Sequence, residues 1–414
     1  MKGEEKMGEF LRFVSREEIY KEYILRLNAV SEIEKLNVLN TFNRVSSKNI
    51  ISNEDLPGFF RANVDGYALK AEETFGASSE MPAFFKIKGE IKIGEEPSMK
   101  LETQEAVKVS TGGTIPQGAN AVVMVENTQE VEDFVEVYKT ISPWENVLKA
   151  DEDIKSGEII VEKGKKITHK DIHNLLALGV TEIEVFRKVK IGIISTGDEI
   201  IEPWETKVSK YHVRDSNTYF LLTYLQNLGF EAVRLGHVSD NYAELLKNVE
   251  NALNDFDIII TCGGSSLGVR DYTMKVFSEV GKVVYHGALI KPGKPTVFGL
   301  SGNKVLLGLP GNPASFVSST ILFLLPILRK LSGEIDVLPK PDFYVKLDTN
   351  VPATQGRERF VHVRLYRKNH EIFANPVLGD SGLVSLVRKS DGMVRIPLGV
   401  EGVYKGELCE FYQF

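Results

Sequence analysis

The chain has 414 residues, of which 43% are hydrophobic and 26% are charged, so it is long enough to form more than one buried core. Its formal net charge is −7 and its pI is near 5.7. A protein that binds nucleic acid needs a basic face to displace counterions from the phosphates, so this charge balance argues against a nucleic-acid partner.

The sequence gives no reason to expect secretion or membrane insertion. The N-terminus carries lysines and glutamates where a secretory signal would carry an apolar stretch. The longest apolar run, residues 321–328, is short and contains Pro326, which favours a buried helix over a membrane span. Only Cys262 and Cys409 are present, too few for a disulfide framework. We therefore expect a cytoplasmic protein without a membrane partner.

The first half of the chain changes from helical to strand periodicity and back. Residues 15–36 carry apolar side chains at helical spacing, with Glu17 and Glu18 in the first turn. Strand patterns separated by Gly and Pro follow, at residues 84–88, 106–110, 121–125 and 134–138. A helical pattern returns at residues 169–178. This order indicates a β-rich module inserted into a mixed one.

Between residues 188 and 332, buried strands alternate with helices, which predicts a doubly wound, mostly parallel sheet. The strand at 257–261 is followed by a glycine-rich loop at 262–268, and the strand at 305–309 is followed by a loop at 310–313. A helical pattern begins after each of these loops. Small residues let the backbone approach a ligand closely, and the free N–H groups at a helix start favour anions. We therefore predict one anion-binding crevice in this sheet.

A stiff turn, Lys291-Pro-Gly-Lys-Pro295, lies between those two loops and places two ammonium groups on a short arc. A lysine pair beside a turn is usually only solvated. Next to two glycine-rich helix starts, the pattern instead favours an anion clamp formed by Lys291 and Lys294.

Acidic residues stand at strand ends or loops around this cationic centre. They are Asp198, Glu199, Asp215, Asp240 and Asp271. Carboxylates suit Mg²⁺ that is shared with phosphate oxygens. Asp215 and Asp240 also precede helical patterns, where an acid commonly caps the backbone. Capping and catalysis both remain open for these two residues.

Eight short motifs follow one another along nearly the whole chain, from about residue 10 to the C-terminus. They are Val-Asp65-Gly-Tyr-Ala, Ser-Thr111-Gly-Gly, Asp-Glu-Asp153-Ile, Ser-Thr-Gly-Asp-Glu199, Arg-Asp215-Ser-Asn217, Gly263-Gly264-Ser-Ser266 with Asp271-Tyr, Lys291-Pro-Gly-Lys294-Pro295, and Pro310-Gly311-Asn312-Pro313 with Ser315. Together they resemble the molybdopterin molybdenumtransferase family, which includes the MoeA-like proteins and the E domain of gephyrin. A single motif would carry little weight, whereas eight in order are specific.

The resemblance implies Mg²⁺-dependent insertion of molybdate, or of tungstate, into adenylylated molybdopterin, with release of AMP. It assigns catalytic roles to Asp65, Asp153, Glu199, Asp240, Asp271, Lys291 and Lys294, with Glu199, Asp240 and Asp271 as the metal ligands. It assigns substrate binding to Thr111, Asp215, Asn217, Gly263, Gly264, Ser266, Pro295, Pro310, Gly311, Asn312, Pro313 and Ser315. Family members also use an arginine and a serine of the C-terminal domain at a proposed molybdate pocket, so Arg357, Arg359 and Ser381 are candidates.

The fold class that we expect is a multidomain α/β protein with a central molybdopterin-binding domain. Strand patterns after the Pro-Lys-Pro linker at residues 339–341 predict a C-terminal β domain. The predicted domains are a mixed N-terminal domain at 8–52 and 146–187, an inserted β-rich domain at 53–145, the α/β domain at 188–334, and the C-terminal β domain at 340–414. The resemblance implies a homodimer whose site lies between the sheet domain of one subunit and the N-terminal modules of the other.

The chain departs from the family pattern at a few positions. It has Ala62-Asn-Val64 where Ser and Met commonly precede the first motif, and Asn241 where a second Asp often stands. Cys262 and Ser265 replace residues that are often Ser and apolar. These changes leave the predicted acids in place, although the hydrogen bonding of the glycine-rich loop is expected to differ.

Two other functions remain to be compared with molybdenum insertion. The sheet domain alone resembles a molybdopterin adenylyltransferase, but such enzymes usually consist of that domain only. A separate adenylyltransferase is instead a possible partner that supplies the substrate. The third function is a scaffold, because gephyrin also anchors receptors through its E domain; the sequence shows no receptor groove.

Overall fold

The structure is a computed structural model that describes residues 13–206, 208–263 and 267–414, with the backbone alone described at residues 267–271. The predicted ligand-binding residues Gly264 and Ser266 lie outside the described residues. The chain divides into two compact units. Unit 1 comprises Met1–Lys48, Lys163–Thr168 and Glu184–Phe414, and unit 2 comprises Asn49–Glu162 and His169–Ile183.

The centre of unit 1 is a six-stranded sheet. Its strands, in spatial order, are β17 (Glu231–Val238), β14 (Lys190–Thr196), β18 (Ile258–Gly263), β23 (Lys304–Leu309), β22 (Val297–Ser301) and β19 (Lys282–Tyr285). The first four strands are parallel to one another, and β22 and β19 run antiparallel to their neighbours. The chain moves from β14 to β17 at one edge and then to β18 on the other side of β14, which is a topological switch point.

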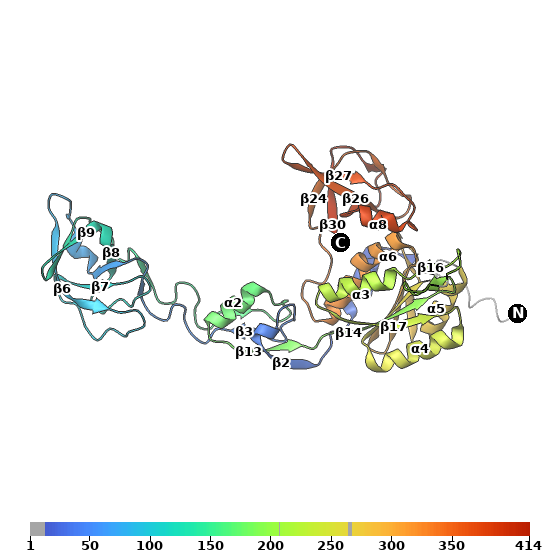
Figure 1. Cartoon of the computed structure of the whole chain (residues 1–414), viewed down its shortest axis with the longest axis horizontal. Coiled ribbons are helices and arrows are strands. Elements are labelled where there is room, and N and C mark those ends of the chain that lie inside the picture. The colour runs from blue at the N-terminus through green and yellow to red at the C-terminus, as the bar shows by residue number, and fades with distance from the viewer. Residues whose placement is uncertain (1–12, 207, 264–266) are drawn as a thin grey trace. The chain divides into compact units, whose positions relative to one another are not determined.

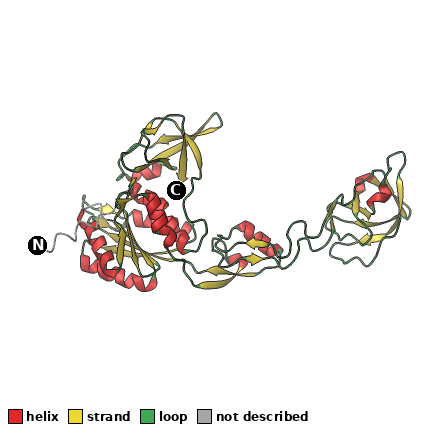
Figure 2. Ribbon diagram, turned by 180° about the vertical axis from the view of Figure 1, so that it is seen from behind, coloured by secondary structure: helices red, strands yellow, loops and turns green. Residues whose placement is uncertain are grey.

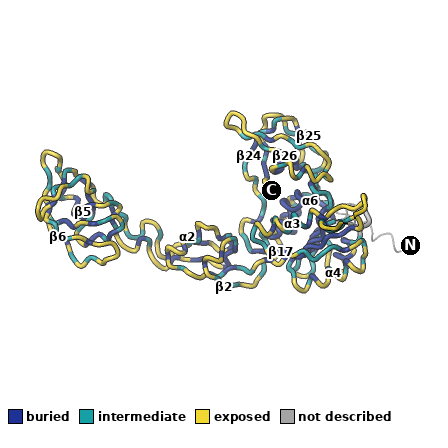
Figure 3. The backbone as a smooth tube through the Cα atoms, viewed as in Figure 1, coloured by how far each residue is buried: buried dark blue, intermediate teal, exposed yellow. Residues whose placement is uncertain are grey.

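Helices cover both faces of this sheet because its central strands are apolar on both sides (Figures 1 and 3). In β18, Ile258 and Ile260 face one core, whereas Ile259 faces the other. The first core includes residues of α3 (Asn217–Asn227) and α6 (Pro313–Ser319), and the second includes residues of α4 (Tyr242–Asp255) and α5 (Leu267–Val280). The predicted fold class, a multidomain protein around a doubly wound, mostly parallel sheet, is confirmed.

The helical stretch Pro313–Leu331 has 19 residues and a mean hydropathy of 1.5, so by length and composition it could cross a membrane. In the fold, 89% of this apolar window is buried, as in a core helix. It consists of α6, a π-helical turn η5 (Thr320–Leu324) and α7 (Leu325–Leu331). The π turn precedes Pro326, which has no N–H to donate to the turn before it. The buried helix predicted at residues 321–328 is confirmed.

The helix predicted over residues 15–36 is wrong beyond its first two turns. Strand β1 (Phe13–Val14) is followed by α1 (Arg16–Glu22), which Ser15 caps by accepting a hydrogen bond from the Glu18 N–H at 3.1 Å. A 3₁₀ turn, η1 (Ile24–Arg26), then ends the helical segment. Later residues form β2 (Ile33–Asn37), which pairs with β13 (Glu182–Phe186), a partner that local periodicity cannot reveal.

The C-terminal part of unit 1 is a closed ring of five strands joined to the sheet domain by a short parallel pairing. The ring follows the order β26 (Glu358–Lys368), β27 (Glu371–Pro376), β24 (Phe343–Leu347), β30 (Leu408–Gln413) and β28 (Gly392–Ile396), and β28 pairs again with β26. Strand β21 (Ile290–Lys291) pairs in parallel with β26, and α8 (Val384–Lys389) lies beside α6 in Figure 1. The pairing brings Lys291 beside Arg359.

Strands outnumber helices in unit 2, and long loops connect them (Figure 2). Its six-stranded sheet has the order β8 (Ala121–Met124), β5 (Gly66–Leu69), β7 (Glu105–Val109), β6 (Ala83–Ile91), β10 (Phe134–Val137) and β9 (Thr128–Val131). Two small pairings, β4 (Arg61–Ala62) with β11 (Val147–Leu148) and β3 (Ile50–Ile51) with β12 (Ile159–Val161), and the helix α2 (His169–Ala177) complete it. The four strands predicted between residues 84 and 138 and the helix predicted at 169–178 are confirmed within a few residues.

Candidate functional site

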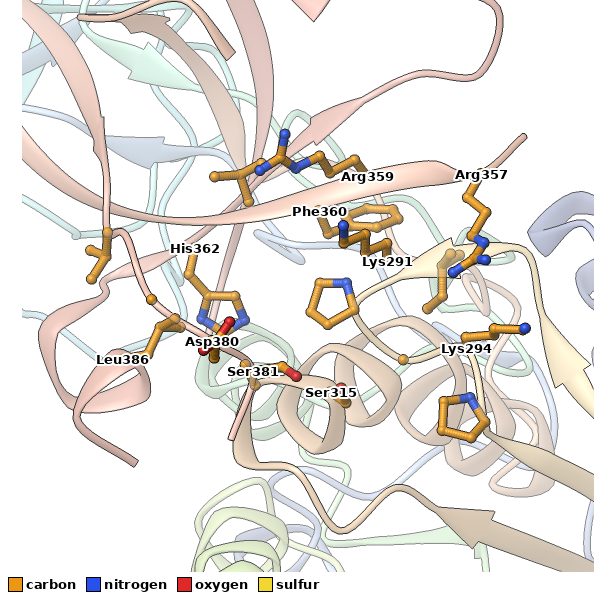
Figure 4. A pocket seen from close by; sticks show the side chains of 18 residues that line it. Lys291, Lys294, Ser315, Arg357, Arg359, Phe360, His362, Asp380, Ser381 and Leu386 are labelled. Carbon is orange, nitrogen blue, oxygen red and sulfur yellow. The ribbon is translucent and has the colours of Figure 1, made fainter. Parts of the chain in front are cut away.

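A cationic pocket of about 410 Å³ lies in unit 1, between the lysine-bearing turn and the C-terminal strand ring (Figure 4). Seven of the residues singled out from the sequence by motif or resemblance line it: Lys291, Lys294, Pro295, Ser315, Arg357, Arg359 and Ser381. Asp380 is the one acidic residue among the lining side chains that the structure describes. The pocket therefore combines four cations with two hydroxyl groups.

A backbone hydrogen bond and close packing around Gly293 fix the turn that carries Lys291 and Lys294. The Ala288 N–H donates to the Lys294 carbonyl at 3.0 Å and closes the turn. Gly293 has φ +112°, and a Cβ there would lie 2.8 Å from the Ser319 hydroxyl oxygen, so this position requires glycine. Neither lysine has an ion-pair partner among the residues that the structure describes. Their positive charges are thus available to a ligand.

Strand β26 supplies the opposite wall. Arg357, which directly precedes the strand, and Arg359 within it line the pocket, while Glu358 between them is buried with an exposed fraction of 4%. The Arg16 Nε donates to Glu358 Oε2 at 2.8 Å, and the Arg395 Nε donates to Glu358 Oε1 at 2.7 Å. The carboxylate of Glu358 is therefore neutralised on the far side of the strand from the pocket.

Sequence reasoning did not identify His362, which also lines the pocket. The imidazole is 4% exposed, and its burial lowers the pKa of His362 to about 4. Figure 4 shows it beside Asp380 and near Ser381. A single histidine on an alternating strand carries no sequence signal that distinguishes it from an ordinary core residue.

A second cavity, the strand-end pocket, has a volume of about 210 Å³ and lies at the carboxyl ends of β14, β18 and β23, at the switch point of the sheet. Its lining includes the predicted residues Glu199, Asp215, Asn217, Gly263, Gly311, Asn312 and Pro313, and also Cys262, a buried thiol whose pKa burial raises. A cavity therefore lies where the two loops leave the sheet, whereas the predicted lysine clamp lines the other pocket, and anion binding at the strand ends stays a prediction. Pro310 directly precedes these lining residues, at the end of β23.

The two pockets share a wall. The Asn312 Nδ2 donates to the Ser381 hydroxyl at 3.3 Å, and the Ala314 N–H donates to the Ser381 carbonyl at 3.0 Å. Asn312 lines the strand-end pocket, whereas Ala314 and Ser381 line the cationic pocket. A ligand with two anionic parts could therefore contact both cavities through this segment.

Asp215 caps a helix and pairs with an arginine. Its carboxylate accepts from the Thr218 N–H at 3.1 Å and from the Arg234 Nη2 at 3.0 Å. Burial alone would raise the pKa of Asp215, but hydrogen bonds from Thr218 and Arg234 outweigh burial and lower it. Nearby, the Asn217 Nδ2 donates to the Gly311 carbonyl at 2.7 Å and ties α3 to the loop after β23. Of the two roles left open for Asp215, capping is present.

Asp240 does not cap the following helix. Asn241 caps α4 instead, accepting from the Glu244 N–H at 3.1 Å. The Asp240 N–H donates to Asp198 Oδ1 at 2.9 Å, while Asp240 Oδ1 is buried without a hydrogen-bond partner in the described structure. Burial, followed by the charges of Asp198 and Glu199, raises the pKa of Asp240. The Asp240 oxygen without a hydrogen-bond partner is thus free to accept a cation.

Two of the three predicted metal ligands, Glu199 and Asp240, are among the described side chains. Among all the side chains that the structure describes, no three acids, histidines or cysteines lie close enough together to hold a metal ion. Asp271, the third predicted ligand, lies in α5, and its side chain is outside the described part of the chain.

Unit 2 contains the other three predicted residues. Asp65 Oδ1 accepts from the Thr111 N–H at 2.7 Å and from the Thr111 hydroxyl at 3.1 Å, so these two motifs meet. Asp153 lies in an exposed loop, where its N–H donates to the Leu56 carbonyl at 3.0 Å. The exposed carboxylates of Asp65 and Asp153 face solvent rather than a packed core.

Comparisons with known proteins cover the chain from residue 14 to its end. Three family models match: the MoeA N-terminal region (domain I and II) at residues 14–179, a probable molybdopterin binding domain at 192–330, and the MoeA C-terminal region (domain IV) at 344–414.

Individual relatives agree with these matches. A putative molybdopterin biosynthesis protein of Methanocaldococcus jannaschii is 37% identical, with 93% of each chain covered. A molybdopterin molybdenumtransferase of Haemophilus influenzae is 31% identical, with 80% of each covered. A crystal structure of the moeA molybdopterin biosynthesis protein of Pyrococcus horikoshii OT3 is 29% identical and superposes with a TM-score of 0.85, covering 97% of this chain and all of the other. The chain belongs to the MoeA family of molybdopterin molybdenumtransferases.

Proposed function

We propose that the protein inserts molybdate or tungstate into adenylylated molybdopterin and releases AMP. The observation that carries this proposal is the cationic pocket, in which Lys291, Lys294, Arg357 and Arg359 surround one cavity. A tetrahedral oxyanion dianion offers acceptors to several donors at once, and arginine supplies fixed geometry where lysine supplies a movable point charge. The hydroxyl groups of Ser315 and Ser381 add neutral donors.

The neighbouring strand-end pocket suits the phosphate-bearing part of the substrate. It lies at the switch point of the sheet, where anionic ligands bind in doubly wound folds. The Asn312 and Ser381 contact connects it to the cationic pocket. We propose that the pterin nucleotide lies along this shared wall, so that its dithiolene end approaches the oxyanion while its phosphates stay at the strand ends.

Glu199 and Asp240 would hold a Mg²⁺ ion, with Asp271 as a third predicted ligand. The orphaned Asp240 oxygen supports this assignment. When bound, Mg²⁺ supplies positive charge that neutralises the phosphate oxygens of the nucleotide. The side chains of the chain itself bind and orient the two anions, so that catalysis rests on positioning and on charge and requires no nucleophilic side chain.

An adenylyltransferase activity would not explain why residues of the C-terminal part of unit 1 line the cationic pocket. Such an enzyme needs only a sheet domain, whereas Arg357, Arg359 and Ser381 of the C-terminal ring line the cationic pocket. We also propose that the protein acts in the cytoplasm and receives its substrate from a separate adenylyltransferase. No observation on the described surface favours a scaffold role over the enzymatic one.

The test is an insertion assay with purified protein, adenylylated molybdopterin and Mg²⁺, with molybdate and tungstate in parallel reactions. We expect AMP release that depends on one or both oxyanions. Release that is independent of either oxyanion would contradict insertion. Formation of adenylylated molybdopterin from ATP and molybdopterin would support the adenylyltransferase instead.

We further propose a homodimer in which Asp65, Thr111 and Asp153 of one subunit complete the pocket of the other. The test mixes an Asp65→Ala protein with a Lys294→Ala protein at an oxyanion concentration too low for the weakened Lys294→Ala site to be active. Each heterodimer would contain one intact site, so part of the activity should return. If activity stays absent after verified subunit exchange, each subunit builds its own site.

A further inference from the structure

We propose that Phe13, in the first described strand, is a positioning residue for the cationic pocket, because its ring face holds the Lys294 ammonium in place without neutralising it. This inference rests on the proposed function, in which Lys294 binds the oxyanion. Lys294 Nζ lies 4.3 Å from the centroid of the Phe13 ring. That distance is within the range of a favourable cation–π contact.

The chemical nature of the group beside the Lys294 ammonium determines whether the ammonium can still bind an anion. A carboxylate beside the ammonium would cancel its charge and compete with an incoming anion. An aromatic face attracts the ammonium through its quadrupole but carries no net charge. Lys294 has no carboxylate partner in the described part of the chain, so its full positive charge remains available to the pocket. The ring therefore fixes the position of the cation and leaves its charge unpaired.

The backbone brings Phe13 to this position. Strand β1 pairs in parallel with β20 (Gly287–Ala288), with Phe13 opposite Gly287 and Val14 opposite Ala288. The Leu289 N–H donates to the Val14 carbonyl at 2.8 Å. This pairing joins the N-terminal strand to the same segment that enters the lysine turn.

Gly287 leaves the space that the ring occupies. A Cβ on Gly287 would lie 2.4 Å from two Phe13 ring carbons and 2.8 Å from the Lys294 carbonyl oxygen. Contacts this short do not occur, so any larger residue at position 287 would displace the ring or the turn. The close approach of ring, glycine and turn indicates that Phe13 is fitted to the lysine turn rather than resting on an open surface.

A second contact fixes the same N-terminal segment to the opposite wall of the pocket. Arg16, three residues after Phe13, donates to both carboxylate oxygens of Glu358, at 2.8 and 3.1 Å. Both side chains are buried, and Glu358 stands between the pocket residues Arg357 and Arg359. The segment thus contacts the lysine wall through Phe13 and the arginine wall through Arg16.

The test uses the full-length protein and measures binding of molybdate and of tungstate by calorimetry, without the pterin substrate. We expect Phe13→Leu to weaken oxyanion binding about fivefold, since loss of a partly exposed cation–π contact is of that order. Phe13→Tyr keeps the ring face and should bind like wild type. In the insertion assay, Phe13→Leu should raise the KM for the oxyanion and leave kcat within about twofold.

Val14→Ala is the matched control, because it loosens the same strand without removing the ring. It should lower thermal stability but leave oxyanion binding unchanged. A loss of binding in Val14→Ala equal to that in Phe13→Leu would overturn the proposal, since strand packing alone would then explain the effect. Wild-type affinity in Phe13→Leu would overturn it as well.

A double-mutant cycle tests whether Phe13 acts through Lys294. In the Lys294→Met background, Phe13→Leu should cause no further loss of oxyanion affinity. An equal loss in both backgrounds would overturn the proposal. Failure of the proposed function has a different signature: wild-type protein would then bind neither oxyanion, and the inference would be rejected together with the proposed ligand of the pocket.

Discussion

The two pockets of unit 1 differ in how their charged groups are partnered. In the strand-end pocket, Asp215 is satisfied internally by Thr218 and by Arg234, which also contacts Glu202 at 2.7 Å. In the cationic pocket, Lys291 and Lys294 have no ion-pair partner among the described residues. A charge that is paired within the protein stabilises the fold, whereas an unpaired charge in a cleft costs stability and binds ligands.

This difference predicts opposite effects of mutation. Removing a paired charge should reduce stability, because it leaves its partner buried and uncompensated. Removing an unpaired charge should reduce ligand affinity and leave stability unchanged or slightly improved.

Arg234→Met should cause the largest loss of stability. Its guanidinium bonds Asp215, Glu202 and the Thr218 hydroxyl, and the Asp215 side chain is only 4% exposed. Without Arg234, that carboxylate is left buried and unpaired, which costs on the order of 3 kcal/mol. Urea unfolding measures this change. Arg26→Met removes an exposed ion pair with Glu22 and should stay within about 0.5 kcal/mol of wild type. Equal losses in the two variants would contradict a special role for the Arg234 cluster.

His362 should make the fold sensitive to acid. The unfolded chain takes up a proton near pH 6.5, whereas burial keeps His362 neutral in the folded protein until about pH 4. The stabilising contribution is therefore complete above pH 6.5 and is lost as the pH falls towards 4, with a total on the order of 3 kcal/mol.

The measurement compares urea unfolding at pH 7.5 and 4.5 in wild type and in His362→Gln. The variant should lose less stability between these two pH values than wild type, because it removes the proton uptake. His173→Gln, at an exposed histidine, should behave like wild type. Parallel pH profiles for wild type and His362→Gln would show that carboxylates alone cause the acid sensitivity.

Sequence reasoning identified the parts of the site that depend on local pattern. The turn at Lys291 and Lys294 could be predicted because prolines and glycine restrict its shape. The strand ends could be predicted because small residues follow the apolar runs. Family resemblance added Arg357, Arg359 and Ser381, which the fold brings to the same pocket as the lysines.

The features missed from the sequence depend on long-range pairing. Phe13 reaches Lys294 only because β1 pairs with β20, and Arg16 reaches Glu358 across 342 positions of the chain. The helix predicted over residues 15–36 failed for the same reason, since β2 is fixed by pairing with β13. Local periodicity reports which face of a segment is apolar, but not which distant segment it meets.

The smallest effect, and the sharpest test of the contrast between the pockets, concerns Lys294. Lys294→Ala should weaken oxyanion binding at least about tenfold, or about 1.4 kcal/mol, because a lysine in a partly desolvated cleft attracts an anion more strongly than one in bulk water. The apparent affinity comes from the oxyanion dependence of AMP release, and thermal unfolding should change little, because the ammonium has no internal ion pair to lose and only its contact with the Phe13 ring is removed. Lys247→Ala, on an exposed position of α4, should match wild type in both measurements. Equal losses of affinity in the two variants would mean that general electrostatics attracts the substrate. A large loss of stability in Lys294→Ala would mean that Lys294 stabilises the fold, as the paired charges of the strand-end pocket do.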